Sequence, residues 1–257
     1  MRTIIAAALA IMAVPVAAEP RSGSVVLPVS FAGLPVGKLE YTVTLDGRRY
    51  TIDGRGATGG VGRLASSASS VFRARGRLGA NGPVPRSHSL SYRDGKKEGS
   101  ASIRFSKGQV VSTKETPPPT PRKDRVPVPK GARAGAVDPT SALIVPAAAK
   151  ADIAAVCARK LKIFDARNLF TLTMRPSRTI RLADGTRAHI CAAAYKAIGG
   201  HRASSKAVKR FERNRSLSIT YAPIVQGGDT TVWGIVGFRA KTRFGTARGE
   251  AKGVDAV

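Results

Sequence analysis

The chain has 257 residues, of which 42% are hydrophobic, enough to bury a core, so the chain as a whole is not disordered. Lys and Arg total 43 against 16 Asp and Glu, which gives a formal net charge of +27. Three His and two Cys are too few for multi-metal or iron–sulfur frameworks, and the many Gly and Pro are more typical of short strands than of long helices.

The first 18 residues have the pattern of a secretory signal peptide. Arg2 supplies a positive charge, Ile4–Val14 is a continuous apolar run, and small residues precede a cleavage position after Ala18. The apolar run is shorter than the roughly 20 residues that span a bilayer, and no later stretch approaches that length. We therefore expect export to the periplasm and a mature chain, 19–257, that folds as a single β-rich domain without a transmembrane segment.

Alternating apolar and polar residues predict an antiparallel meander of roughly ten to thirteen strands. The first clear strand is Lys38–Asp46, which ends in an Asp-Gly hairpin signal. A turn centred on that dipeptide sets Val43 opposite Tyr50 and Tyr41 opposite Ile52, all on one face.

Further hairpins are predicted where Asp-Gly, Lys-Gly or a Gly-rich loop separates two alternating runs. Lys107-Gly108 sets Phe105 opposite Val110. The other expected hairpins join Leu90–Tyr92 to Ala101–Phe105, Thr179–Ala183 to Thr186–Tyr195, and Leu217–Tyr221 to Thr230–Phe238 through a loop at Gln226–Asp229, with a last strand at Ala240–Ala247.

Two segments interrupt the meander. Residues 116–130 are rich in Pro and predict an extended loop. After it, Asp138 is suited to cap a helix with Pro139 in its first position, and the apolar sequence extends to about Ala149, with a resumption to Val156. We expect this helix to cover one face of the sheet, and a second helix within Ser204–Asn214.

Cys157 and Cys191 are the only cysteines, and export places them where disulfides persist. Their spacing fits neither a CxxC redox centre nor a zinc knuckle. A bridge closing this loop is worth roughly 3–4 kcal/mol in chain entropy. We predict the disulfide, with two buried free thiols as the alternative.

Several short motifs resemble a bacterial envelope family known as "domain of unknown function 3108". They are Phe31–Gly37 followed by Tyr41 and Tyr50, Asp138–Leu143 at the midpoint, and Cys157, Ile163–Arg167 and Cys191 in the second half. Ala166 departs from the pattern, where Gly is common, as does the very basic Lys196–Arg215. The resemblance implies an exported protein of unsettled function whose large, strongly curved antiparallel sheet or open barrel, with one or two short covering helices, is similar to periplasmic lipid and lipoprotein carriers.

The sequence shows little sign of catalytic, cofactor or metal chemistry. Asp53–Gly59 contains GxGxxG, but it follows a hairpin rather than opening a βαβ unit, and strand-end or bulge glycines explain it better. We expect His88 and His189 to be structural residues in strands, His201 to lie in a loop, and Asp165 to cap or to pair with Arg167. We therefore expect no catalytic residues, no cofactor and no metal; only a spatial cluster of His, Asp and Ser in a cleft would support an enzyme.

Positive charge is the main functional signal. Between Lys196 and Arg215 the only acidic residue is Glu212. On a helix Arg202, Lys206, Lys209 and Arg213 share one face, so the candidate anion-binding residues are Arg202, Lys206, Lys209, Arg210 and Arg213. A solvated surface is the alternative. Export and the low aromatic content argue against nucleic acid and in favour of lipid phosphates or other envelope anions, with peripheral membrane contact.

We therefore hypothesise a non-enzymatic envelope protein that supports envelope integrity by binding a lipid-like ligand, or a protein partner, in the concavity of its sheet. The alternative is a periplasmic scaffold without a small ligand. An envelope-polymer enzyme and an integral outer-membrane barrel are less favoured, the latter because it needs aromatic girdles. A packed interior would remove the carrier version of the first hypothesis.

Overall fold

The computed structural model describes residues 19–226 and 230–256. The segment predicted as a signal peptide lies outside the described residues, as does most of the loop predicted at Gln226–Asp229. Fifteen strands form one antiparallel sheet in the order β7-β6-β5-β4-β3-β2-β1-β14-β13-β12-β11-β10-β9, while β15 pairs with β1 and β8 with β13. The order begins at β7 and ends at β9, so the sheet stays open, which confirms the predicted curved, mainly β fold.

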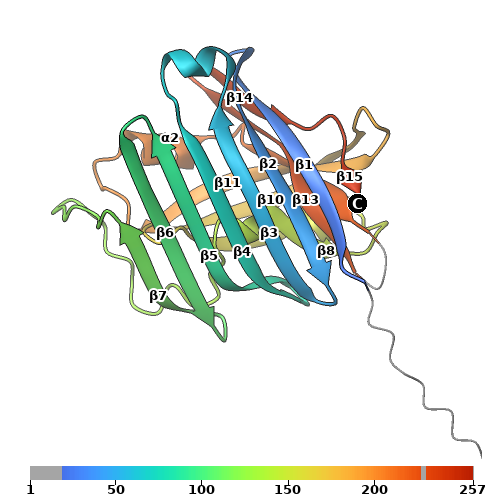
Figure 1. The fold of residues 1–257 in the computed structure, drawn as a ribbon, viewed down its shortest axis with the longest axis horizontal. Coiled ribbons are helices and arrows are strands. Elements are labelled where there is room, and N and C mark those ends of the chain that lie inside the picture. The colour runs from blue at the N-terminus through green and yellow to red at the C-terminus, as the bar shows by residue number, and fades with distance from the viewer. Residues whose placement is uncertain (1–18, 227–229, 257) are drawn as a thin grey trace, which may run out of the picture.

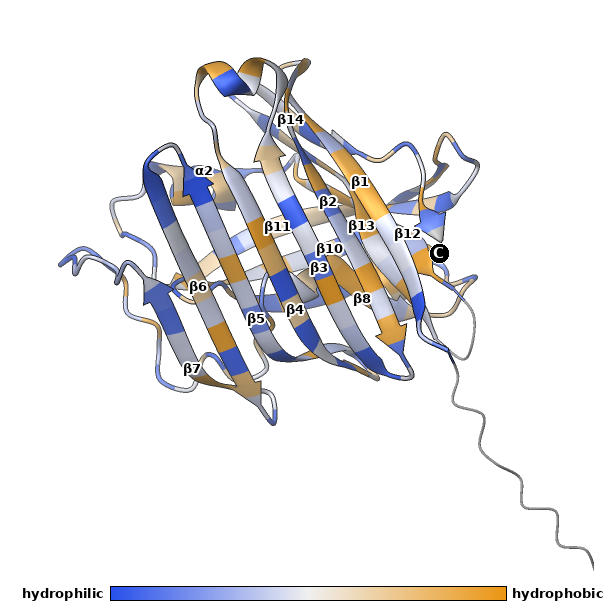
Figure 2. Cartoon of the chain, in the orientation of Figure 1, coloured by the Kyte–Doolittle hydropathy of each residue, from blue (hydrophilic) through white to orange (hydrophobic). Residues whose placement is uncertain are grey.

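The first seven strands form a wide meander that makes one layer of the molecule (Figure 1). Hydrophobic and hydrophilic residues alternate along these strands (Figure 2), as a layer with one buried face requires. Its elements are β1 (Arg21–Phe31), β2 (Leu34–Asp46), β3 (Arg49–Thr58), the 3-10 helix η1 (Gly60–Leu64), β4 (Ser69–Gly79), β5 (Gly82–Asp94), β6 (Lys97–Ser106) and β7 (Gln109–Thr116).

The second half of the chain forms a layer behind the first, and its strands β9, β10 and β11 run across those in front (Figure 1). The two layers join where β1 pairs with β14. The elements of this half are η2 (Ser141–Leu143), β8 (Ile144–Ala147), α1 (Ile153–Cys157), β9 (Arg159–Phe164), β10 (Leu169–Arg181), β11 (Arg187–Gly199), α2 (Lys206–Arg213), β12 (Ser218–Val225), β13 (Thr231–Thr242), β14 (Gly245–Glu250) and β15 (Asp255–Ala256).

The register predicted for the first hairpin was wrong by two residues. Val43 lies opposite Ile52, and Leu45 lies opposite Tyr50. The turn consists of Gly47 and Arg48, and Gly47 has a positive φ of 55°, which a residue with a side chain adopts less readily. A shift of two keeps every side chain on its face, so the predicted inward face is still the buried one.

Other hairpins follow the prediction with local differences. Phe105 pairs with Val110 as expected. The strand predicted at Ala240–Ala247 is divided, because Arg243 and Phe244 form a turn between β13 and β14. Residues 117–135 between β7 and the second layer contain no strand of the sheet, in agreement with the predicted Pro-rich loop.

The predicted helix from Asp138 to Ala149 was wrong. Asp138 does cap a turn, since its Oδ1 accepts a hydrogen bond from the Ser141 amide at 2.8 Å, but only the short η2 follows. The β-branched Ile144 and Val145 then continue as β8, which pairs with β13. Both side chains are fully buried and belong to the core, so this segment fills space between the layers that a lipid-carrier interior would leave for a ligand.

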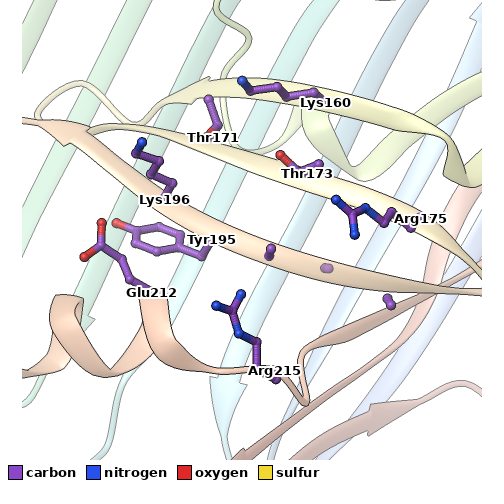
Figure 3. Close-up of a pocket in the computed structure, with 11 residues that line it drawn as sticks. Lys160, Thr171, Thr173, Arg175, Tyr195, Lys196, Glu212 and Arg215 are labelled. Carbon is purple, nitrogen blue, oxygen red and sulfur yellow. The ribbon is translucent and has the colours of Figure 1, made fainter.

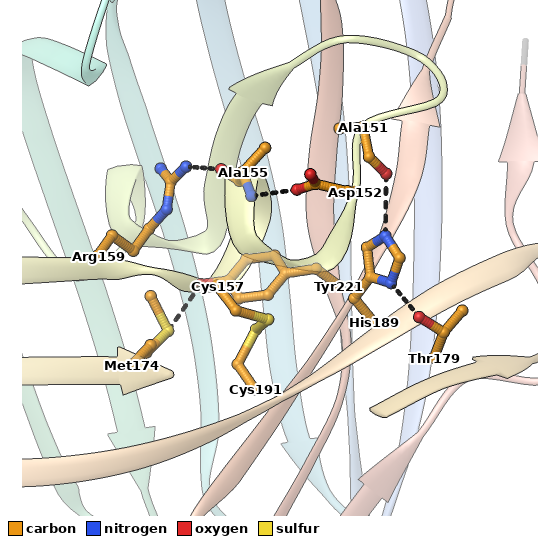
Figure 4. The surroundings of a disulfide bond; sticks show 10 residues. All are labelled: Ala151, Asp152, Ala155, Cys157, Arg159, Met174, Thr179, His189, Cys191 and Tyr221. Atoms are coloured by element: carbon orange, nitrogen blue, oxygen red, sulfur yellow. Dashed lines mark hydrogen bonds between the residues drawn. A yellow bond between two sulfur atoms is a disulfide. The ribbon is translucent and has the colours of Figure 1, made fainter. Parts of the chain in front are cut away.

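The predicted disulfide between Cys157 and Cys191 is confirmed, with Cα atoms 5.3 Å apart. It fastens α1 to the inner face of β11 (Figure 4). Beside it, His189 lies between the Ala151 carbonyl, 3.1 Å from Nε2, and the Thr179 hydroxyl, 2.9 Å from Nδ1. The carbonyl can only accept, so Nε2–H donates to it. Both ring nitrogens of this buried histidine therefore have hydrogen-bond partners within the fold, consistent with the predicted structural role.

Candidate anion-binding surface

The structure brings together His88, Asp138 and Ser141, three residues that sequence reasoning left apart. The Ser141 hydroxyl donates to Asp138 Oδ2 at 2.6 Å, and His88 Nδ1 lies 3.3 Å from Asp138 Oδ1. Tyr50 completes the cluster, since its hydroxyl lies 2.7 Å from Ser141 Oγ. Burial, together with the nearby carboxylate, raises the pKa of Tyr50.

This Asp138 cluster has a different arrangement from a nucleophilic triad. The carboxylate stands between the serine and the histidine, so the imidazole is not placed to take the serine proton. Asp138 and Ser141 have 0% exposure and His88 has 5%, so the group lies inside the core and not in a cleft. The cluster holds η2 against the first layer of the sheet.

The remaining motifs have structural positions. Gly54, within the GxGxxG, lies in β3 where a Cβ would come 2.2 Å from the Phe72 ring, so the glycine permits close packing. Asp165 Oδ1 accepts from the amides of Arg167 and Asn168, a local cap, whereas the Arg167 guanidinium pairs with Glu115. Within residues 19–226 and 230–256, no group of His, Cys, Asp and Glu is arranged to hold a metal ion.

The basic segment forms helix α2 and the turns on each side of it. The Ser205 hydroxyl caps the first turn by accepting from the Val208 amide at 3.3 Å. Glu212 Oε1 accepts from the Ala197 amide on β11 at 3.1 Å, and Asn214 Nδ2 donates to the Lys241 carbonyl on β13 at 3.1 Å. The helix is thus fastened to two strands, and its single acidic residue serves as an anchor.

The predicted basic stripe is shorter than expected. Arg202 precedes the helix, and its Nε donates to Asp124 Oδ2 at 2.9 Å. The hydrogen bonds from Arg202 and from the Ser204 hydroxyl lower the pKa of Asp124. The stripe therefore consists of Lys206, Lys209 and Arg213, which are exposed, and Arg202 belongs to an ion pair that joins the Pro-rich loop to the turn before α2.

A groove of about 770 Å³ lies between α2 and the turn joining β13 to β14. We call it the α2 groove. Phe31, Phe211 and Phe244 supply aromatic surface, and the last two are 47% and 63% exposed. The Arg243 guanidinium lies 4.2 Å above the Phe244 ring. The cations that line the groove are Arg210, Arg213, Arg215, Lys241 and Arg243.

A second depression, of about 630 Å³, lies across β9, β10 and β11 beside α2 (Figure 3). We call it the strand hollow. Thr171 and Thr173 contribute hydroxyls, and Tyr195 and Glu212 lie at the α2 side. Its cations are Lys160, Arg175, Lys196 and Arg215.

Sequence reasoning therefore located one part of a larger basic surface. Arg210 and Arg213 line the α2 groove as candidates, whereas Lys206 and Lys209 lie on the exposed stripe beside it. The cations from β9, β10 and β13 were missed because they are distant in sequence. Polar residues at alternate positions, Thr171, Thr173 and Arg175, were the available signal for a polar strand face, of which Thr171 is buried and Arg175 is exposed.

The chain matches the family model described as "Protein of unknown function (DUF3108)" over residues 28–252. A search of curated proteins found no match. Among solved structures, the chain is similar to the crystal structure of a beta-barrel-like protein of domain of unknown function DUF1849 from Brucella abortus. The two share 13% identity with a TM-score of 0.50, over 93% of this chain and 98% of that one. At this identity the likeness concerns the fold.

Proposed function

The chain belongs to the DUF3108 family of proteins of unknown function, and we propose that it is an exported, non-enzymatic envelope protein that binds an anionic lipid surface through the α2 groove. The observation that carries the proposal is the exposure of Phe211 and Phe244 among five cations. Aromatic rings suit the boundary between headgroups and acyl chains, while Lys and Arg attract lipid phosphates.

The site differs from the one first hypothesised. Residues of η2 and β8 occupy the concavity of the sheet, which supports a lipid contact on the outer surface instead. In the described residues no helix is both long and apolar enough to cross a membrane. The proposed contact is peripheral, and a role in envelope integrity follows from holding the protein, and any protein partner, at the membrane.

The experiment compares two double variants that each remove two positive charges. Lys241→Gln/Arg243→Gln changes the α2 groove, whereas Arg75→Gln/Arg77→Gln changes exposed residues of β4 in the other layer. Each cation near an anionic surface contributes about 1 kcal/mol, so the groove variant should bind phosphatidylglycerol vesicles about 30-fold more weakly in cosedimentation. The β4 variant should bind nearly as well as the unmodified protein.

A second comparison tests the aromatic component. Phe244→Ala should weaken vesicle binding even at high salt, where charge is screened, and Leu64→Ala, at a 90% exposed residue of η1, should not. Equal weakening by both double variants would show a general charge effect and overturn the groove. Absence of vesicle binding by the unmodified protein would favour the scaffold hypothesis.

Export is part of this proposal. It is supported by the sequence pattern of residues 1–18 and by the disulfide, which is typical of oxidising compartments. Intact-mass analysis of envelope fractions should find the chain beginning at Glu19. Retention of Met1 in the exported protein would contradict cleavage after Ala18.

A further inference from the structure

We propose that the strand hollow is a second binding site, which shares only Arg215 with the α2 groove, and that its ligand is a phosphorylated saccharide. Nothing in the family description or in the fold likeness assigns a ligand to this place.

Strand register places the polar side chains of the hollow on one face. Thr171 pairs with Lys196, Thr173 lies between Lys160 and Ala194, and Arg175 pairs with Ala192. Directly paired residues of neighbouring strands share a face, so these side chains all lie on the face opposite the buried Met174 and Ala193. The short side chains of Ala192 and Ala194 leave a shallow floor. The longer cationic side chains surround it (Figure 3).

The cations of the hollow lack acidic partners in the described part of the chain. The ion pairs found there involve none of Lys160, Arg175, Lys196 and Arg215. Glu212, the one carboxylate at the edge, already accepts a hydrogen bond from the Ala197 amide. Like charges gathered around one depression repel one another, and a bound oxyanion with several negative oxygens would relieve that repulsion.

The size of the hollow and its uncharged lining residues indicate the kind of molecule to which the phosphate is attached. A volume of about 630 Å³ is within the range of sites for small organic ligands and far larger than one phosphate group needs. Thr171 and Thr173 offer hydroxyls that both donate and accept, as sugar hydroxyls require. Tyr195 pairs with Leu172 and so belongs to the opposite face, where its ring packs against Phe170, and it borders the hollow only at the α2 edge.

The test titrates fructose 1,6-bisphosphate into the full mature chain by calorimetry at fixed ionic strength. The bisphosphate should bind at one site per chain, more tightly than inorganic phosphate, and fructose should not bind. Lys160→Gln/Arg175→Gln should reduce the affinity at least tenfold, whereas Arg75→Gln/Arg77→Gln should leave it unchanged. Ala194→Leu, which alters no charge, should also reduce it by filling the floor.

Three results would overturn the proposal: equal losses in the two charge variants, unchanged binding by Ala194→Leu with its fold intact by circular dichroism, or inorganic phosphate binding as tightly as the bisphosphate. Vesicle binding separates this site from the α2 groove, because Lys160 and Arg175 do not line that groove and their variant should still bind phosphatidylglycerol. Competition by phosphatidic acid vesicles distinguishes the source: displacement of the bisphosphate would assign the phosphate to a lipid headgroup, and no displacement to a soluble saccharide.

Discussion

The Asp138 cluster and the basic surface around α2 both concentrate polar side chains, but the first is buried in the core and the second consists mainly of exposed cations. Inside the core, Asp138 accepts from the Ser141 amide and hydroxyl and lies beside His88. On the surface, the stripe of α2 and the strand hollow collect cations with one carboxylate among them, and that carboxylate binds backbone. Residue type alone therefore does not mark a functional site: buried polar groups that contact one another stabilise the fold, whereas like charges gathered on the surface favour binding of an outside partner.

The largest expected effect comes from breaking the Asp138 cluster. Asp138→Ala removes the acceptor of the Ser141 amide and hydroxyl inside the core and takes away the carboxylate beside His88, so we expect unfolding free energy to fall by about 3–5 kcal/mol in urea denaturation. Ser141→Ala, which keeps the carboxylate, should cost less. Vesicle binding by the folded fraction should be unchanged. A loss below about 1 kcal/mol would contradict a stabilising role.

The disulfide should have the next largest effect. Cys157→Ser releases a loop whose closure is worth roughly 3–4 kcal/mol, and the loss should be that large at most. Cys191→Ser is the matched variant and should lose a similar amount. Thiol labelling of the denatured, unreduced protein should find no free thiol. Since Cys191 faces inward from β11 while Ala192 faces the strand hollow, reduction should weaken bisphosphate binding only when it unfolds the protein.

Features that depend on neighbouring residues could be predicted from the sequence, whereas features that depend on the pairing of distant strands could not. Period-two alternation depends on local burial, so the strands, the inward faces and the open sheet could be predicted. The helix at Asp138 could not be excluded, because an N-cap signal and an apolar run also describe a capped turn that enters a buried strand. The basic segment was visible because it is contiguous. Lys160 and Arg175 were not, because only the pairing of β9, β10 and β11 brings them beside Lys196.

Removing charge from the α2 stripe should separate binding from stability. Lys206, Lys209 and Arg213 are exposed, so replacing all three with Gln should change unfolding free energy by no more than about 0.5 kcal/mol. Binding to phosphatidylglycerol vesicles should weaken at least tenfold at low salt and much less at high salt, because the interaction is screened within about 8–10 Å at moderate ionic strength. Unchanged binding, with the fold intact by circular dichroism, would leave the stripe as a solvated surface.

Replacing Arg202 should have the smallest effect on vesicle binding, because Arg202 lies outside the stripe and pairs with Asp124. The pair lowers the pKa of Asp124, so it contributes stability at pH values above the ordinary carboxyl pKa of 3.8, and this contribution is lost as the pH falls through the lowered value. Arg202→Gln should therefore raise the pKa of Asp124 towards 3.8 in an NMR titration, while the Ser204 hydrogen bond prevents full recovery. Because Asp124 already offsets the guanidinium charge, Arg202→Gln should weaken vesicle binding less than Lys206→Gln, a matched loss of one charge from the stripe. Equal weakening by the two variants would show that Arg202 contributes to vesicle binding as much as Lys206 does.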